Sequence, residues 1–175
     1  MKKVFIYSMM TVFLSFTGMA SAESVKIGFV DAQHLLETSV LGKETQKKVE
    51  EYVKSRQKIV ELEEKNLREL EEELRSQADL LTEEAKKVKQ SEFQSKVLDF
   101  QKRARDLNQE VQNKKVSSLR EFNGKMEVAI KVVAEKEDYL FVLDKNNEGG
   151  SVLYSKAALD ITDKVLAQLD KDAGK

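Results

Sequence analysis

The chain has 175 residues, with 30 Lys and Arg against 31 Asp and Glu, one histidine, no cysteine and no proline. Without cysteine it can form neither a disulfide nor a thiolate metal site, so its stability must come from packing or assembly. Its near-neutral charge does not suit a general binder of nucleic acid or another polyanion.

The first 22 residues have the organisation of a secretory signal peptide. Lys2 and Lys3 precede an apolar stretch over residues 4–16, and Ala20-Ser21-Ala22 offers the small residues of a cleavage site. The stretch is shorter than the ~20 apolar residues that span a membrane, so an uncleaved anchor helix is the less favoured alternative. We predict cleavage after Ala22 and export to a bacterial periplasm.

Residues 23–42 are predicted to begin a small folded body with a strand and a short helix. Apolar residues at alternate positions favour a strand with one apolar face. They are Val25, Ile27 and Phe29. Asp31 follows the strand and is placed to cap a helix over residues 32–37.

Residues 43–136 contain a single glycine, Gly124. Glu, Lys, Gln, Arg and Leu dominate this span, and apolar residues recur every three to four positions. The span is too long for one ordinary helix of a compact domain and too polar for a packed interior. It therefore indicates long helices of coiled-coil type.

Thr82 marks the predicted turn of a helical hairpin. A threonine followed by Glu83 and Glu84 is a favourable helix start, because the hydroxyl caps the backbone and carboxylates suit the helix N-terminus. Ser91 with Gln94 is a weaker alternative start. We predict one helix over about 41–81 and a second from 82 or 83 to 135–137, antiparallel to each other.

The apolar seams of both helices are interrupted. Arg56 and Glu63 interrupt the first, and the second is predicted to become polar at Lys114 and Lys115 before it resumes at Leu119. Gly124 lies close to this second interruption. It is a candidate hinge, with a tolerated surface glycine as the alternative.

The two helices carry opposite charge on either side of the turn. Residues 61–84 include ten acidic and three basic side chains, and residues 86–105 include seven basic and two acidic ones. The favoured interpretation is charge matching across the hairpin. The alternative is a basic tip, Lys86, Lys87 and Lys89, that makes weak contact with an anionic membrane surface or with acidic partners.

Residues 137–175 are predicted to complete the body. The continuous apolar run 139–143 is typical of a strand covered on both faces. Residues 151–154 follow a polar loop that contains Gly149 and Gly150, so the pair is predicted to form a β-hairpin. An amphipathic helix over 158–169 closes the chain.

This body is too small to be stable alone, because it has only roughly 60 residues and three short strands. The base of the second long helix is apolar nearly all round at 128–134, which predicts burial on every side. We therefore predict an obligate homo-oligomer with a shared core. The predicted core residues are Val25, Ile27, Phe29, Ile130, Val133, Leu140, Val142 and Val152.

No catalytic motif is present. His34 is the only histidine, and no residues that could complete a metal site or a triad are grouped around it. The Gly149-Gly150 pair is a turn signal and not a phosphate-binding loop. We predict neither enzymatic activity nor a cofactor.

The end segments carry a family resemblance. Residues 26–31, the long hairpin, residues 139–144 and the segment 160–166 resemble the Skp/OmpH family of periplasmic chaperones over essentially the whole chain after the signal peptide. The resemblance implies an α+β fold in which a long antiparallel coiled-coil hairpin projects from a small β-rich trimerisation body. It also implies a jellyfish-shaped homotrimer whose arms hold unfolded outer-membrane proteins without ATP.

Under that function, inward-pointing residues of the hairpin are candidate client contacts. They are Leu67, Leu74, Phe93 and Phe100, together with the tip lysines Lys86, Lys87 and Lys89. For the four apolar residues, packing in the seam between the two helices is the favoured alternative. The rival function is a periplasmic coiled-coil spacer or adaptor that links envelope partners.

Overall fold

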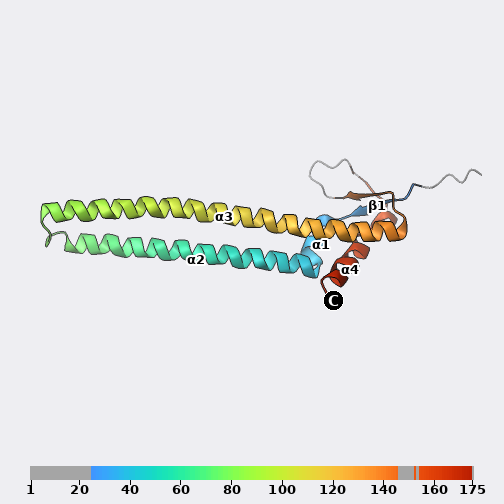
Figure 1. The fold of residues 1–175 in the computed structure, drawn as a ribbon, viewed down its shortest axis with the longest axis horizontal. Helices are drawn as coiled ribbons and strands as arrows, with labels where there is room; N and C mark the ends of the chain where they lie inside the picture. The colour runs from blue at the N-terminus through green and yellow to red at the C-terminus, as the bar shows by residue number, and fades with distance from the viewer. Residues whose placement is uncertain (1–24, 146–151, 153, 175) are drawn as a thin grey trace, which may run out of the picture.

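The computed structural model describes residues 25–145, 152 and 154–174. A long helical hairpin projects from a small body at its base (Figure 1). The elements in chain order are β1 (Ile27–Val30), α1 (Ala32–Thr38), α2 (Val40–Gln77), α3 (Glu83–Glu137), β2 (Phe141–Asp144), the 3-10 turn η1 (Ala157–Leu159) and α4 (Thr162–Asp172). The predicted signal peptide lies outside the described residues.

The predicted turn near residue 82 is confirmed. The Thr82 hydroxyl accepts a hydrogen bond from the backbone N–H of Ala85 at 3.3 Å, and Glu83 and Glu84 occupy the first turn of α3. α2 ends at Gln77, earlier than predicted, because tight backbone bonds such as Leu80 N to Gln77 O at 3.0 Å replace the helical ones. The alternative start at Ser91 is wrong, since this residue lies inside α3.

The second seam becomes polar at Lys114, as predicted, but it does not resume at Leu119. The seam continues from Val111 through half-buried Lys114 to Ser118, which is 9% exposed, and α3 is unbroken there. Leu119, predicted to resume the seam, is 44% exposed. Val111, Lys114 and Ser118 are separated by three and then four positions, so they share one face of α3. Ser118 therefore lies in the seam, and its neighbour Leu119 does not.

β1 and β2 form a parallel pair, with Ile27 opposite Phe141 and Val30 opposite Asp144. Parallel strands need a long crossover, and here the whole helical hairpin supplies it. The predicted strand over residues 139–143 begins only at Phe141. Asp138 ends α3 in the left-handed conformation, with a φ of 59°, and residues 139 and 140 connect it to β2. In the single chain one face of this strand stays open, with Phe141 56% and Leu143 41% exposed, and its predicted cover on both faces depends on the predicted oligomer.

The predicted β-hairpin partner over residues 151–154 includes residues 151 and 153, which lie outside the described residues. Val152 and Tyr154 are described and belong to no strand. On its side away from β2, β1 is joined to Asp160 by an isolated parallel bridge at Phe29.

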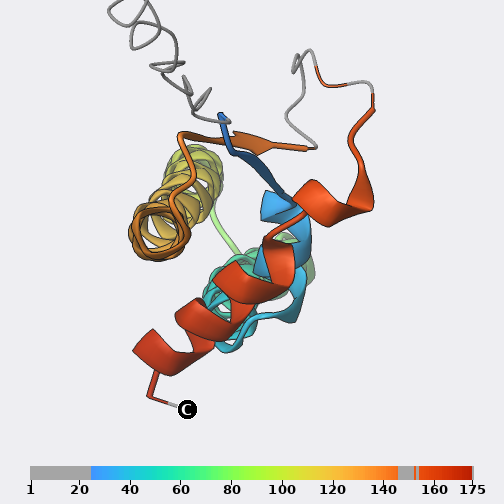
Figure 2. The same cartoon turned by 90° about the vertical axis from the view of Figure 1, so that its right-hand side faces the viewer.

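The closing helix starts at Thr162, later than the predicted 158. Residues 160 and 161 are held next to β1, where the Ile161 N–H donates to the Phe29 carbonyl at 2.8 Å, and only the short η1 precedes them. α4 then packs against α1, α2 and α3 at the base of the hairpin (Figure 2).

One core joins these elements. Its buried members are Val30, Leu35, Phe122, Met126, Ala129, Val133, Ile161, Val165 and Leu169. The core therefore draws on both ends of the chain and on the basal part of α3.

A tight corner links α1 to α2. Ser39 is fully buried and accepts a hydrogen bond from the Gly42 N–H at 3.0 Å, while the Val40 N–H donates to the Asp170 carboxylate at 2.8 Å. A Cβ atom on Gly42 would lie 2.1 Å from the Leu36 carbonyl oxygen. Only glycine fits at this position, and the corner fixes where the hairpin leaves the body.

Candidate functional site

The candidate site lies on the hairpin formed by α2 and α3. The described residues contain no group of three or more His, Cys, Asp or Glu side chains that could hold a metal ion. Within the same part of the chain, no helix has the length and apolar character needed to cross a membrane. His34 is an exposed residue of α1.

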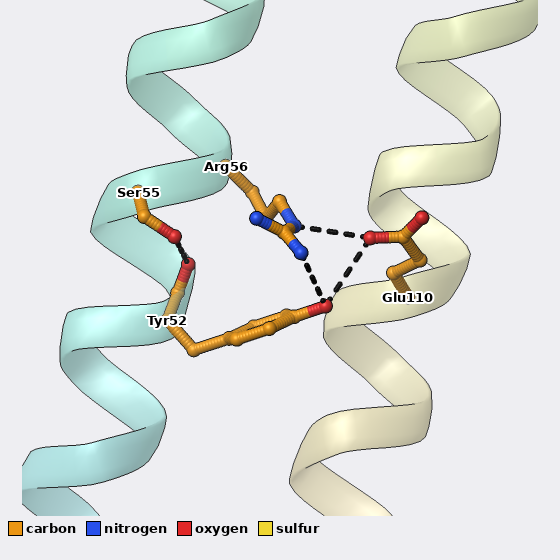
Figure 3. A network of polar contacts seen from close by, with 4 residues as sticks. All are labelled: Tyr52, Ser55, Arg56 and Glu110. Atoms are coloured by element: carbon orange, nitrogen blue, oxygen red, sulfur yellow. Dashed lines mark hydrogen bonds and ion pairs between the residues drawn. The ribbon is translucent and has the colours of Figure 1, made fainter.

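A polar cluster joins α2 to α3 where the first seam is interrupted (Figure 3). The Arg56 Nε donates to Glu110 at 3.0 Å, and the Tyr52 hydroxyl donates to the same carboxylate oxygen at 3.2 Å. Arg56 also donates to the Tyr52 hydroxyl at 3.0 Å and lies over the Tyr52 ring at 4.3 Å. We call Tyr52, Arg56 and Glu110 the clasp.

The clasp accounts for one of the residues that interrupt the predicted seam. The hydrogen bond with Tyr52, more than that with Glu110, raises the pKa of Arg56 above its ordinary value. The guanidinium is charged at any ordinary pH, so the bond to Glu110 is charge-assisted. Sequence reasoning missed Tyr52 and Glu110. A tyrosine four residues before a seam arginine was the available signal, because positions i and i+4 share a helix face.

Closer to the tip, the Arg103 Nε lies 2.8 Å from Glu63, the other residue that interrupts the first seam. Lys89 donates to the Gln77 side chain at 3.3 Å. Within the described residues, Glu63–Arg103 is the one ion pair that joins α2 to α3 between the clasp and the turn. The predicted charge matching is therefore made at a single pair, and most charges of the two stretches face solvent.

A groove of about 760 Å³ runs between α2 and α3 on the tip side of the clasp. Leu67, Leu70 and Phe100 line its apolar part, and Lys96, Asp99 and Arg103 are among the charged residues at its rim. It brings together the predicted contacts Leu67 and Phe100. Leu74 and Phe93 lie farther along the same seam, and all four are half-buried.

The three tip lysines do not form one free cluster. Lys86 forms an ion pair with Glu83 at 2.8 Å, and Lys89 is bound to Gln77. Lys87 is exposed. Gly124 lies in unbroken helix, and a Cβ atom added there would have no neighbouring atom within 4 Å.

A second, almost wholly apolar groove of about 390 Å³ lies near the base of the arms. Leu36, Val49, Val53 and Leu119 line it. Sequence reasoning missed this groove because it assigned Leu119 to the seam. Leu119 lies three residues before Phe122 and therefore fits the seam spacing, so the spacing alone could not reveal this groove.

The residues predicted for the oligomer core have three environments. Phe29 and Val133 are buried by their own chain, at 8% and 6% exposure. Ile27, Ile130, Val142 and Val152 are half-buried. Val25 and Leu140 are 62% and 61% exposed, and the body also exposes Val128, Val132, Phe141 and Leu143. A single chain thus leaves a broad apolar surface on the body.

Segments from the two ends of the chain meet at Asp160 and Thr162. The Asp160 carboxylate accepts hydrogen bonds from the Thr162 hydroxyl at 2.6 Å and backbone N–H at 2.9 Å, and Thr162 in turn accepts from the Asp31 N–H at 3.0 Å. The Thr162 hydroxyl bond, together with nearby Lys145, lowers the pKa of Asp160. This network fastens α4 to the end of β1.

Glu137, the last residue of α3, is held by two lysines. Lys164 lies 2.6 Å from its carboxylate, and Lys26 donates to its backbone carbonyl at 2.6 Å. The Lys164 hydrogen bond lowers the pKa of Glu137, and Glu137 in turn raises the pKa of Lys164. Two cations at a helix C-terminus also suit the helix dipole.

Comparison with known proteins places this geometry in a family. Residues 26–169 match the family described as outer membrane protein (OmpH-like). Among solved structures, a proposed outer membrane chaperone (OmpH-like) from Caulobacter crescentus CB15 superposes with a TM-score of 0.77 at 18% sequence identity, over 83% of this chain and 84% of that chain. No curated protein matches the sequence significantly.

Proposed function

This chain belongs to the OmpH-like family, and we propose that it is a periplasmic chaperone that holds unfolded outer-membrane proteins without using ATP. Such clients expose apolar strands with unpaired edges, the kind of surface that aggregates. The hairpin arms would shield these surfaces through many weak contacts. No catalytic step is part of the proposal.

The observation that carries the proposal is the incomplete packing of α2 against α3 on the tip side of the clasp. Leu67, Phe100 and their seam neighbours are half-buried and border an open groove with a charged rim. Half-buried apolar side chains still expose apolar area to water, and covering that area would contribute about 25 cal/mol per Å². A client segment that covers them gains that energy without unfolding the arm.

The same proposal includes an oligomer, with three copies as the resemblance implies. The apolar surface of the body, which includes Val25, Val128 and Leu140, supports a shared interface, because exposed apolar patches of this kind mark protein contacts. Arms that project from such a body would surround a cavity. Entry into the periplasm through a cleaved signal peptide completes the proposal.

The test is suppression of aggregation. Several unrelated outer-membrane proteins are diluted from denaturant with and without the purified chain, and light scattering is followed. We expect suppression at roughly one oligomer per client. Leu67→Gln combined with Phe100→Gln should weaken it, because both changes reduce the apolar area of the groove.

The matched control is Leu98→Gln with Val116→Gln. Both residues are on α3 and are 65% and 56% exposed, away from the groove. Equal loss in the control and groove variants would contradict the assignment of the groove. A chain that leaves all aggregation unchanged while it captures one fixed partner would instead be a spacer or adaptor.

A further inference from the structure

The groove between α2 and α3 on the tip side of the clasp has an apolar floor. The side chains of the floor are half-buried, except for Leu107, which is 8% exposed. In order from the clasp towards the turn they are Leu107, Phe100, Leu67 and Leu70. The Glu63–Arg103 ion pair crosses this floor at 2.8 Å. Because each of these two charges has the other as its partner, neither needs one from a bound segment.

The rim of the same groove is charged. Four exposed side chains of α3 line it and form no ion pair or hydrogen bond within the described residues: Lys96, Asp99, Lys102 and Asp106. Two of them are basic and two are acidic, so together they have no net charge. Such a rim suits polar side chains of either sign, whereas apolar side chains that covered it would remove unpaired charges from water at a cost in free energy.

The floor has the length of a short extended segment. The contacts between α2 and α3 fix a register in which Leu70 lies level with Lys96. Lys96 precedes Leu107 by 11 residues on α3, so the floor is about 16 Å long at ~1.5 Å per residue. Alternate side chains of an extended segment are ~6.6 Å apart, so three of them span about 13 Å and fit on this floor.

The order of residues in such a segment decides how many apolar side chains it can bury. Successive side chains of an extended segment point to opposite sides, so only every second one can reach the floor. Six residues in which apolar and polar side chains alternate place three apolar side chains on the floor. The same six residues with the three apolar ones in a row place at most two there. The polar side chains of the alternating segment point to water and to the rim.

We propose that the groove recognises this pattern: it binds a client segment of about six residues in the extended conformation, in which apolar and polar side chains alternate. Membrane-spanning strands of outer-membrane barrels alternate in this way over ~10 residues. The backbone groups of α2 and α3 are used within the helices, so the segment gains its affinity from side chains and not from strand pairing. This inference rests on the proposed function, and it names the part of the client that the groove binds.

Two labelled peptides of eight residues test the inference. Both contain three Leu and five Ser, and the Leu residues alternate with Ser in one peptide and are consecutive in the other. Fluorescence anisotropy measures their binding to the whole chain. We expect the alternating peptide to bind about fivefold more tightly, because it covers one further Leu side chain on the floor. Equal or tighter binding of the consecutive peptide would overturn the inference.

Two double variants locate the preference. Leu67→Gln with Phe100→Gln reduces the apolar area of the floor and should bring the two peptides to similar affinity. Leu98→Gln with Val116→Gln changes exposed positions of α3 away from the groove and should keep the preference. A preference that persists in the floor variant, or that is lost in the control variant, would overturn the assignment to this groove.

The balanced charge of the rim gives a second test. Alternating peptides with Lys or with Glu in place of Ser should bind within about threefold of each other at about 0.15 M salt, where exposed charges are screened over about 8 Å. A strong preference for one sign would mean that the groove recognises charge and not alternation, and it would overturn the inference.

The aggregation assay on the same preparation separates this inference from the proposed function. Suppression of aggregation without a preference between the two Leu peptides overturns the recognition of the pattern alone. A preference without suppression overturns the holding of whole clients, and it leaves the groove as a site for short segments.

Discussion

The basal and distal halves of the hairpin are built from the same two helices with the same apolar spacing, yet they are packed differently. In the basal half α3 buries Phe122, Met126 and Ala129, at 2%, 8% and 0% exposure. In the distal half the seam residues, such as Leu67 and Phe100, are only half-buried. The difference lies in what surrounds them: α1, α4 and β1 cover the base, whereas two helices alone cannot enclose a seam.

This difference predicts where stability and function lie. The base should open only with global unfolding, and the distal half should open locally at much lower free energy. The clasp lies between the two halves.

The largest effect is expected from Phe122→Ala. Removal of a fully buried aromatic side chain leaves a cavity, and we expect a loss of about 3–5 kcal/mol in the free energy of unfolding. Phe100→Ala in the distal half should cost about half as much or less, because that ring is already partly solvated. Chemical denaturation measures both, and equal costs would mean that the distal seam is as closed as the base.

Gly42→Ala is expected to destabilise the body by about 2–3 kcal/mol. Its Cβ would lie 2.1 Å from a backbone carbonyl oxygen of α1, and backbone cannot move aside as a flexible side chain can. The α1–α2 corner must then shift, and the core around Leu35 with it. Thermal unfolding measures the loss, and an unchanged midpoint would show that the corner is not tight in solution.

Gly42 also shows where sequence reasoning reached its limit. Local signals, such as Thr82 with its two glutamates, placed the turn of the hairpin correctly because capping depends on neighbouring residues. The need for glycine at position 42 depends on the path of the preceding helix, which no spacing reveals. The parallel pairing of β1 with β2 likewise depends on residues more than 100 positions apart.

The sequence likewise predicted some residues of the candidate site and missed others. Spacing identified Leu67 and Phe100 as seam residues that now line a groove, and it identified Arg56 as an interruption. It could not find the partner Glu110, since the register between two helices sets which residues meet across the hairpin, whereas Tyr52 could have been found from its position four residues before Arg56. It also misplaced Leu119, because one shifted step in the seam moves a residue to another face.

Gly124→Ala should have the opposite sign to Gly42→Ala. Gly124 is exposed in mid-helix with open space around it, so alanine should stabilise α3 by up to about 1 kcal/mol. Thermal unfolding measures the gain. If Gly124 is a hinge, alanine should in addition slow hydrogen exchange of the neighbouring amides and reduce capture of large clients; a gain in stability with neither change would favour the surface glycine.

Acid should weaken the body before it affects the distal arms. The pKa values of Asp160 and Glu137 are lowered in the folded state, by the Thr162 and Lys164 hydrogen bonds respectively. The folded chain thus holds these protons less tightly than the unfolded chain does. Their contribution to stability is complete above the ordinary values of 3.8 and 4.5, and it is lost as the pH falls through the lower folded values.

Asp160→Asn tests this prediction, because the variant keeps the shape of the side chain but cannot titrate. We expect a lower stability at pH 7 and a flatter decline of stability below about pH 4. Asp99→Asn, on the exposed distal part of α3, is the matched control, because it removes one carboxylate outside the body. A decline as steep in D160N as in the original chain would show that Asp160 does not carry the acid sensitivity.

The smallest effect on global stability is expected from Glu110→Gln, which removes the charge from the clasp. Exposed ion pairs contribute little to global unfolding, and the base stays closed by its own apolar packing. Amides of the distal half should nevertheless exchange faster with deuterium, because α2 and α3 lose the ion pair that joins them next to the groove. High salt should accelerate exchange in the original chain and have less effect in the variant, whose clasp carries no ion pair to screen. Exchange that instead rises equally at Phe122 and at Phe100 would mean that the clasp supports the whole hairpin, and the division between a rigid base and an opening distal half would fail.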